Sequence, residues 1–145
     1  MLRGIDPILS PDLLAILRSM GHGDEIVIAD ANFPATSIGP QLVRLDGISA
    51  THVVKAILQI MPLDSFVDHA AWSMQNKAKP GETPEVVQEF QNIIDTVADA
   101  PCKIKPLERF AFYDHAKTAF AVVQTGETRH FGNVILKKGV LPDTA

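Results

Sequence analysis

Apolar residues recur along the chain at spacings that separate expected helices from expected strands. Leu13, Leu17 and Met20 recur every three or four residues, which places them on one face of a helix. Comparable apolar stripes follow further along the chain. The pattern predicts amphipathic helices over 11–20, 50–61 and 84–97, with a shorter helix over 109–117.

Two of these helices carry boundary signals. Ser10 can accept hydrogen bonds from the free amides at the start of the first helix, and Pro11 suits its first position. Thr83-Pro84 repeats this signal before the third helix, so we expect a side-chain cap there too. Gly21 is expected to end the first helix in a left-handed conformation.

Short apolar runs predict the strands. Residues 26–29 are apolar without alternation, a pattern typical of a strand that is covered on both faces. Further strands are predicted over 41–46, 65–74, 103–107, 119–124 and 133–136, with an exposed loop over 75–83. Because helices and strands alternate, we expect one α/β domain over 1–145, an α/β/α arrangement of layers. The short connection between the last two strands predicts an antiparallel portion, and so a mixed sheet.

Composition removes several classes of function. The 13 Lys and Arg residues are outnumbered by 17 Asp and Glu, and no basic run marks a surface for nucleic acid or an anionic membrane. No apolar run approaches the roughly 20 residues that cross a bilayer. Cys102 is the only cysteine, which excludes an intrachain disulfide and a cysteine-rich zinc site. The lone thiol and the lack of a signal-like apolar stretch at the amino terminus favour a cytoplasmic location.

Polar residues follow the buried run 26–29 directly, at the edge where open α/β sheets bind ligands. Asp30 and Asn32 offer hydrogen bonds that suit a polyhydroxylated ligand, and Pro34 stiffens the loop. Asp and Asn also serve plain turn geometry. The residues alone leave both interpretations open.

His22 lies between two glycines before the same strand, and an imidazole can exchange a proton near neutral pH. A polar loop residue after a helix is the simpler interpretation. If 23–29 is extended, at about 3.3 Å per residue His22 and Asp30 lie roughly 20 Å apart. Either the glycines fold His22 back, or a site that uses both residues is completed across a subunit boundary.

The segment ERFAFYDHAKTAF, residues 108–120, holds further candidates. Arg109 stands where a helix is expected to begin, and a cation there opposes the helix dipole. This misfit hints at a ligand role, although Glu108 can also neutralise it. Phe110 and Tyr113, three residues apart, favour packing over recognition.

Other candidates lie near the expected strands. Gly132 permits close approach of the backbone, and Asn133 can donate and accept hydrogen bonds, although a simple turn has the same composition. His69 and Trp72 can form a wall on which a sugar stacks, with a core tryptophan as the default. The chain has no H-E-x-x-H, P-loop, dinucleotide fingerprint or G-x-S-x-G, so metal, nucleotide and serine-hydrolase chemistry are unsupported.

Three long blocks of the sequence are more specific than any single residue. They read MLRGIDPILSPDLLAILRSMGHGDEIVIADANFPA, ERFAFYDHAKTAFAVVQTGE and FGNVILKKGV. In these blocks the chain strongly resembles the RbsD/FucU family, and within it the L-fucose mutarotases. The resemblance runs from the first residue to about residue 140 and is weakest over 62–104.

This resemblance implies a small cytoplasmic enzyme with an RbsD-like fold and without a cofactor or metal. It implies a homo-oligomer, commonly a decamer of two pentameric rings, with sites near subunit interfaces. Members of the family interconvert cyclic forms of monosaccharides: anomers of L-fucose in one branch, and pyranose and furanose forms of D-ribose in the other.

The resemblance also assigns roles by motif. His22 in GHGDE matches the proton donor of the family. Asp30 in ADANFP and Arg109 in RFAFY match substrate-binding positions, and Tyr113 belongs to the same RFAFY segment. The segment Phe131-Gly132-Asn133 stands where relatives usually have Tyr-Gly-Asn.

Phe131 is therefore a departure from the family pattern. It can pack on a sugar but lacks the hydroxyl that would bind or relay a proton. Our leading hypothesis is a mutarotase that opens and recloses the sugar ring with acid and base assistance, its general base being left open. The alternative, suggested by Phe131, is a non-catalytic sugar-binding accessory or regulatory protein of the same fold.

Overall fold

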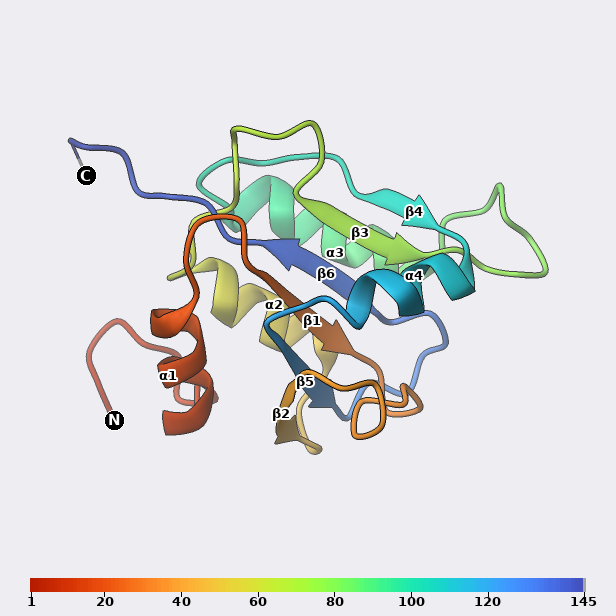
Figure 1. The fold of residues 1–145 in the computed structure, drawn as a ribbon, viewed down its shortest axis with the longest axis horizontal. Coiled ribbons are helices and arrows are strands. Elements are labelled where there is room, and N and C mark those ends of the chain that lie inside the picture. Colours follow the sequence, from red (N-terminus) through yellow and green to blue (C-terminus); the bar gives the residue numbers. More distant parts are fainter. Residues whose placement is uncertain (145) are drawn as a thin grey trace.

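A mixed sheet of six strands runs through the chain, and helices cover both of its faces (Figure 1). The computed structural model describes residues 1–144; Ala145, the last residue of the predicted domain, lies outside the described residues. The helices are α1 (Pro11–Ser19), α2 (Ala50–Leu58), α3 (Glu85–Val97) and α4 (Arg109–Ala116). The strands are β1 (Glu25–Ala29), β2 (Gln41–Leu45), β3 (Ala71–Met74), β4 (Lys105–Leu107), β5 (Ala121–Thr125) and β6 (Val134–Lys137).

The strand order is β2-β5-β1-β6-β3-β4, and only β6 runs against the others. The short last connection correctly predicted an antiparallel portion. However, β5 does not pair with β6, because β1 lies between them: Val27 is the partner of both Val122 and Ile135. Strand β1 is buried on both faces, as its unbroken apolar run predicted, and so takes a central place in the sheet.

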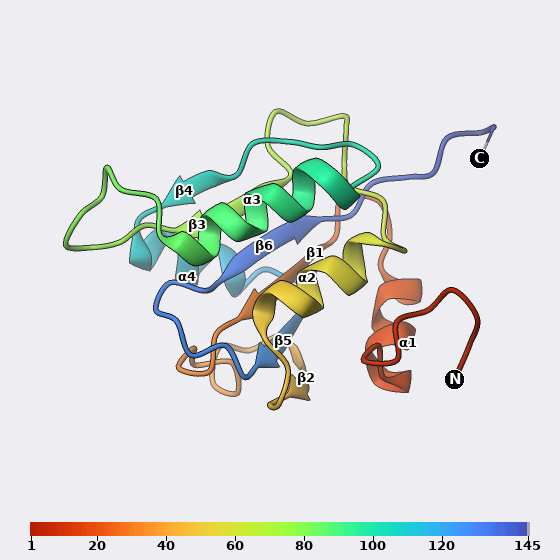
Figure 2. The ribbon, with the colours of Figure 1, turned by 180° about the vertical axis from the view of Figure 1, so that it is seen from behind.

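Alternate residues of the strands face two separate clusters of apolar side chains. Ile26 and Ile28 of β1 face the larger cluster, which is covered by α1, α2 and α3. Val27 and Ala29 face the smaller cluster, which includes Phe112 of α4. Figure 2 shows α2 and α3 across one face, whereas α4 crosses the other face in Figure 1. The predicted α/β/α layering is therefore confirmed, with one short helix on its second face.

The element boundaries depart from expectation in three places. Of the strand predicted over 65–74, only 71–74 is extended in the sheet. Ser10 caps α1 as predicted, but α3 begins at Pro84 without a side-chain cap. Met20, with extended backbone, ends α1, and the left-handed residue of this turn is Gly23 (φ 89°), not Gly21. Cap and turn geometry depend on backbone directions that the residue types do not specify.

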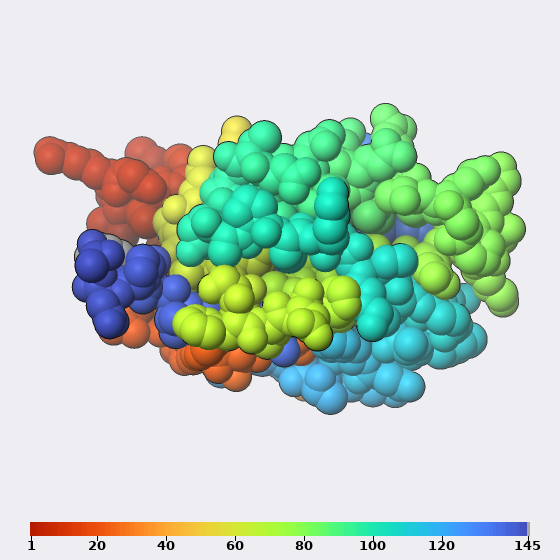
Figure 3. Space-filling model, turned by 90° about the horizontal axis from the view of Figure 1, so that it is seen from above, coloured from red at the N-terminus to blue at the C-terminus, as the bar shows by residue number. Residues whose placement is uncertain are grey.

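The loop between β3 and α3, residues 75–84, projects from one end of the molecule. Figures 1 and 3 show this loop and the amino-terminal residues at opposite ends. Within the described residues, no helix combines the length and the apolar character needed to cross a bilayer.

Gly126 ends β5 in a place with no room for a side chain. A Cβ atom there would lie 2.1 Å from the Asp46 carbonyl oxygen, a backbone atom. We expect Gly126→Ala to lower the free energy of unfolding by about 3 kcal/mol, because the segment after β2 must move. Gly81→Ala, in open space, is the matched control. Urea unfolding of both variants checks this, and equal stabilities would contradict it.

Candidate functional site

A cavity of about 370 Å³ opens at the end of the sheet where the parallel strands have their carboxyl ends. Its lining residues come from four separate segments of the chain. They are Asp30, Asn32, Phe33, Met74, Lys77, Arg109, Tyr113, His130, Phe131 and Asn133.

The strand directions explain why these residues meet. Asp30 follows β1, Lys77 follows β3, and Arg109 follows β4, and these three strands are parallel. Because β6 is antiparallel, its first residues reach the same edge, so Phe131 and Asn133 join them. Asp30 and Asn32, the candidates predicted beyond the carboxyl end of β1, lie at this end of the sheet, which is where ligands gather in open α/β sheets.

Asp30 and Asn133 hold each other in a closed pair of hydrogen bonds. The Asp30 N–H donates to Asn133 Oδ1 at 2.7 Å, and Asn133 Nδ2 donates to Asp30 Oδ2 at 3.0 Å. The Asn32 N–H donates to Asp30 Oδ1 at 3.0 Å, so the predicted turn role of Asp30 is confirmed as well. The Phe33 and Gly132 N–H groups also lie close to this carboxylate, which lines the cavity.

Burial shapes the electrostatics of this carboxylate. Asp30 is only 5% exposed, and its main-chain oxygen accepts from the Gln124 amide. Burial raises the pKa of Asp30, because the charged form loses water, and the hydrogen bonds from Asn32 and Asn133 offset only part of this. Asp30 is therefore protonated more easily than an ordinary aspartate as the pH falls.

Helix α4 brings two further candidates to the cavity. Glu108 caps the helix by accepting from the Phe110 and Ala111 N–H groups. Its negative charge offsets the unfavourable interaction of the Arg109 cation with the helix dipole. Arg109 Nε donates to the Tyr113 hydroxyl at 3.2 Å, and its guanidinium lies 5.5 Å from the centre of that ring. Tyr113 both packs, on Phe33 at 5.5 Å between ring centres, and lines the cavity.

The loop between β5 and β6 is held in one conformation by an ion-pair network. Arg129 contacts Glu127 at 3.1 Å and Glu89 of α3 at 2.9 Å. A Cβ atom on Gly132 would lie 2.7 Å from the side chain of Glu127, so the close approach predicted for this glycine is confirmed. Phe131, which precedes Gly132, has φ 64°. Non-glycine residues rarely adopt this conformation, and it often marks a functional site.

His22 lies at the opposite end of the sheet, where the parallel strands begin. It precedes β1, whereas Asp30 follows it, and the extended strand keeps the two apart (Figure 1). Gly23 turns the chain into β1 and does not fold His22 back toward Asp30. His22 is half-buried, and its Nε2 is 3.1 Å from Asp64 Oδ1. It lines a separate apolar hollow of about 650 Å³ whose other residues include Leu2 and Leu141.

Other sequence candidates lie outside the cavity. Trp72 is 8% exposed and packs on His115, so the default interpretation as a core residue is confirmed, while His69 is exposed. Neither Trp72 nor His69 lines the cavity, so the alternative of a sugar-stacking wall is not supported there.

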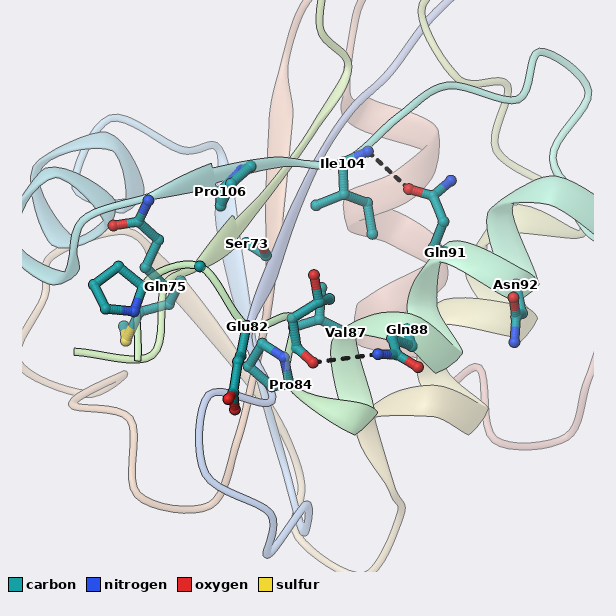
Figure 4. Close-up of a pocket in the computed structure, with 14 residues that line it drawn as sticks. Ser73, Gln75, Glu82, Pro84, Val87, Gln88, Gln91, Asn92, Ile104 and Pro106 are labelled. Carbon is teal, nitrogen blue, oxygen red and sulfur yellow. Dashed lines mark hydrogen bonds between the residues drawn. The ribbon is translucent and has the colours of Figure 1, made fainter. Parts of the chain in front are cut away.

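A second cavity, of about 440 Å³, lies on the other side of Met74, under the loop 75–84 (Figure 4). Two of the four side-chain amides that line it are engaged within the protein. Gln91 donates to the Cys102 carbonyl and accepts from the Ile104 N–H, and Gln88 donates to the Thr83 carbonyl. These bonds fasten neighbouring segments to α3, whereas the sequence candidates Asp30, Arg109 and Asn133 line the first cavity.

The sequence did not predict several residues of the cavity beside Asp30 or the partner of His22. Lys77 and Met74 line the cavity but belong to no motif, and Phe33 lies within ADANFP without having been singled out. Asp64, the partner of His22, lies 42 positions away in the sequence. No local signal predicts such contacts, because they depend on which strands become neighbours.

Comparisons with known proteins identify the family of this chain. The model of the RbsD / FucU transport protein family matches residues 3–141. A relative from Actinobacillus pleuropneumoniae serotype 5b (strain L20), named L-fucose mutarotase, is 46% identical over 144 residues, which cover 98% of this chain and 99% of the relative.

Solved structures of fucose mutarotase and FucU superpose closely on this chain. A fucose mutarotase from Streptococcus pneumoniae, in complex with L-fucose, superposes with a TM-score of 0.89 at 42% identity, covering 97% of this chain and 100% of that one. FucU from Bifidobacterium longum superposes with a TM-score of 0.87, also at 42% identity, with coverage of 97% and 100%.

The fold and the cavity together define a class of α/β protein. In this class a small cavity, lined in part by polar side chains, lies at the carboxyl end of the parallel strands of a mixed sheet. Within that class, the chain belongs to the RbsD/FucU family.

Proposed function

We propose that the protein is a monosaccharide mutarotase, an isomerase that interconverts the α and β anomers of L-fucose or a closely related sugar. The observation that carries this proposal is the cavity where Asp30, Arg109 and Asn133 meet the ring of Phe131. Polar side chains with an aromatic ring suit the two faces of a sugar. The names of the relatives, L-fucose mutarotase and fucose mutarotase, support the same activity and favour it over binding alone.

The reaction needs only acid and base assistance. A proton is delivered to the ring oxygen while another leaves the anomeric hydroxyl, the ring C–O bond breaks, and closure on the opposite face of the carbonyl gives the other anomer. We assign the proton donation to His22 and the binding of sugar hydroxyls to Asp30 and Arg109, with Tyr113 and the segment 131–133 completing the wall. Water or a side chain of a neighbouring subunit serves as the base.

The position of His22 supports a site shared between subunits. In one chain His22 and Asp30 lie at opposite edges of the sheet, so one small sugar does not reach both. Around His22 the surface is apolar: Leu2 and Leu141 are 68% and 65% exposed and line the same hollow. Such a patch suits a subunit interface. We propose that His22 enters the cavity of a neighbour in a homodecamer of two pentameric rings.

Mixed subunits test the shared site. His22→Ala subunits keep an intact cavity, and Asp30→Asn subunits keep an intact His22. In rings assembled from equal amounts of both, about a quarter of the sites combine the two intact halves. At a low sugar concentration we therefore expect about a quarter of the wild-type activity, more than either parent shows. A mixture no more active than its parents contradicts the shared site.

The function itself is tested by saturation transfer between the α and β anomeric protons in NMR. We expect the protein to accelerate exchange of L-fucose, with D-ribose and D-galactose as comparison sugars. Sugar binding by calorimetry without faster exchange would favour the accessory-protein alternative that Phe131 suggested. No acceleration for any of the three sugars would refute the mutarotase proposal. A cytoplasmic location stays a prediction from the lone thiol of Cys102.

A further inference from the structure

His130 lines the cavity beside Asp30, but the proposed reaction gives it no role. The residue is exposed, and within residues 1–144 no carboxylate or hydrogen bond engages its imidazole. By contrast, His22, His52 and His115 face carboxylates at 3.1, 3.0 and 2.8 Å. A neutral imidazole has one nitrogen that donates and one that accepts. His130 therefore presents a free acceptor nitrogen at the cavity.

Three other titratable groups of the cavity are unsuited to take up a proton near neutral pH. Lys77 and Arg109 are cations whose nitrogens only donate. The Tyr113 phenol is a donor as well, and its oxygen already accepts from Arg109 Nε at 3.2 Å. The base that ring opening needs is therefore not one of these three groups.

Asp30 is the remaining carboxylate of the cavity, and both of its oxygens are engaged. The Asn32 N–H donates to one oxygen and Asn133 Nδ2 to the other, each at 3.0 Å. Burial eases the protonation of Asp30, but a proton would weaken both bonds, because a charged acceptor binds donors more strongly than a neutral one. Asp30 therefore suits hydrogen bonding to the sugar, and His130 is left as the group that exchanges a proton near neutral pH.

The segment that carries His130 is fixed on both sides. The Ala31 N–H donates to the Glu127 carbonyl at 2.8 Å, which ties the loop to the end of β1. Arg129 donates from Nε and Nη2 to the two oxygens of the buried Glu127 carboxylate, both at 3.1 Å. The ring of Phe131 lies 6.4 Å from the imidazole, centre to centre. The backbone at residue 130 is thus held beside the cavity, while the exposed imidazole is in reach of water.

We propose that His130 is the proton acceptor of the reaction and takes the anomeric proton through the water that acts as the base. On ring opening the anomeric hydroxyl gives its proton to this water, which gives a proton to the free nitrogen of His130. The electron pair of the O–H bond forms the carbonyl, the ring C–O bond breaks, and the ring oxygen takes a proton from His22. On closure the protons return by the same two routes, so both imidazoles end as they began. The role of His130 rests on the proposed function of the cavity.

His130→Gln removes the proton acceptor and keeps a polar side chain of similar length. We expect kcat for L-fucose exchange to fall about 10²-fold or more. Sugar binding measured by calorimetry should change less than about threefold, because the proton moves only in the transition state. Thr128→Ala is the matched control, since Thr128 is exposed on the same loop and does not line the cavity; it should keep the wild-type kcat. A wild-type kcat in His130→Gln overturns the proposal.

Chemical rescue separates proton transfer from a structural effect. Free imidazole should restore part of the lost rate to His130→Ala, because it can occupy the space left by the side chain and accept the proton. Imidazole also speeds anomer exchange in water, so the rate without protein at the same imidazole concentration is subtracted. The wild type should gain nothing beyond this background. A loss of kcat that imidazole does not restore overturns the role of His130 as proton acceptor.

Nitrogen NMR of the imidazoles tests the position of His130 without a rate measurement. Saturating L-fucose should shift the ring signals of His130 and leave those of His52, which lies outside the cavity, unchanged. Unshifted His130 signals in the sugar-saturated protein contradict the proposal. If the wild type accelerates no sugar, the mutarotase proposal fails and this role with it. If the wild type is active and His130→Gln equally so, only the role of His130 fails.

Discussion

His22→Ala is expected to lose about 10²–10⁴-fold of the acceleration of L-fucose anomer exchange, the usual contribution of a positioned acid or base. The imidazole is the proposed proton donor, and an alanine offers no group to replace it. The binding cavity beside Asp30 stays intact, so sugar binding measured by calorimetry should change far less than the rate. Saturation transfer in NMR measures the loss.

The control for this variant must separate chemistry from folding. Removing the imidazole leaves the buried Asp64 with one partner fewer, which costs about 1–3 kcal/mol of stability. His22→Gln keeps a donor for Asp64 but transfers no proton near neutral pH, so it should fold well and be as inactive. His52→Ala removes another half-exposed histidine with a carboxylate partner and should stay active. An active His22→Gln variant would contradict the assigned role.

Sugar binding is expected to weaken as the pH falls, earlier than an ordinary aspartate would cause. Burial raises the pKa of Asp30, so the carboxylate that accepts from sugar hydroxyls is lost at a higher pH than usual. Asp30→Asn should bind the sugar about 10–100-fold more weakly, because hydrogen bonds to a charged group contribute more than neutral ones. Calorimetry across a pH series measures both effects.

The Asp30→Asn variant also supplies the control for the pH series. It keeps the other titratable groups of the proposed site, the neighbouring subunit's imidazole included, so any pH dependence left in it does not come from Asp30. In this variant one carboxylate oxygen becomes an NH2 group, which faces a donor, either the Asn32 N–H or Asn133 Nδ2. A flip of the Asn133 amide does not relieve this, because the Asn133 oxygen already accepts from the N–H of residue 30. Its unfolding should therefore be measured first. A wild-type pH profile in Asp30→Asn would remove Asp30 from the explanation.

Much of the local structure could be predicted from the residue pattern. Apolar spacing placed the helices and all strands but β3 within about three residues, because an amphipathic stripe or an unbroken buried run shows which faces are shielded from water. The boundaries were less predictable. Only the last four residues of the stretch 65–74 form a strand, and β5 does not pair with β6, because pairing is decided between segments distant in sequence.

The sequence by itself determined the family, the α/β layers and the chemistry on offer: a carboxylate after the central strand, an arginine at a helix start and a histidine between glycines. Only the tertiary structure decided which of these meet. The antiparallel β6 carries Asn133 to Asp30, whereas His22, only eight positions away from Asp30, lies at the other edge beside Asp64. Distance along an extended strand separates neighbours in sequence, and strand pairing unites residues far apart in it.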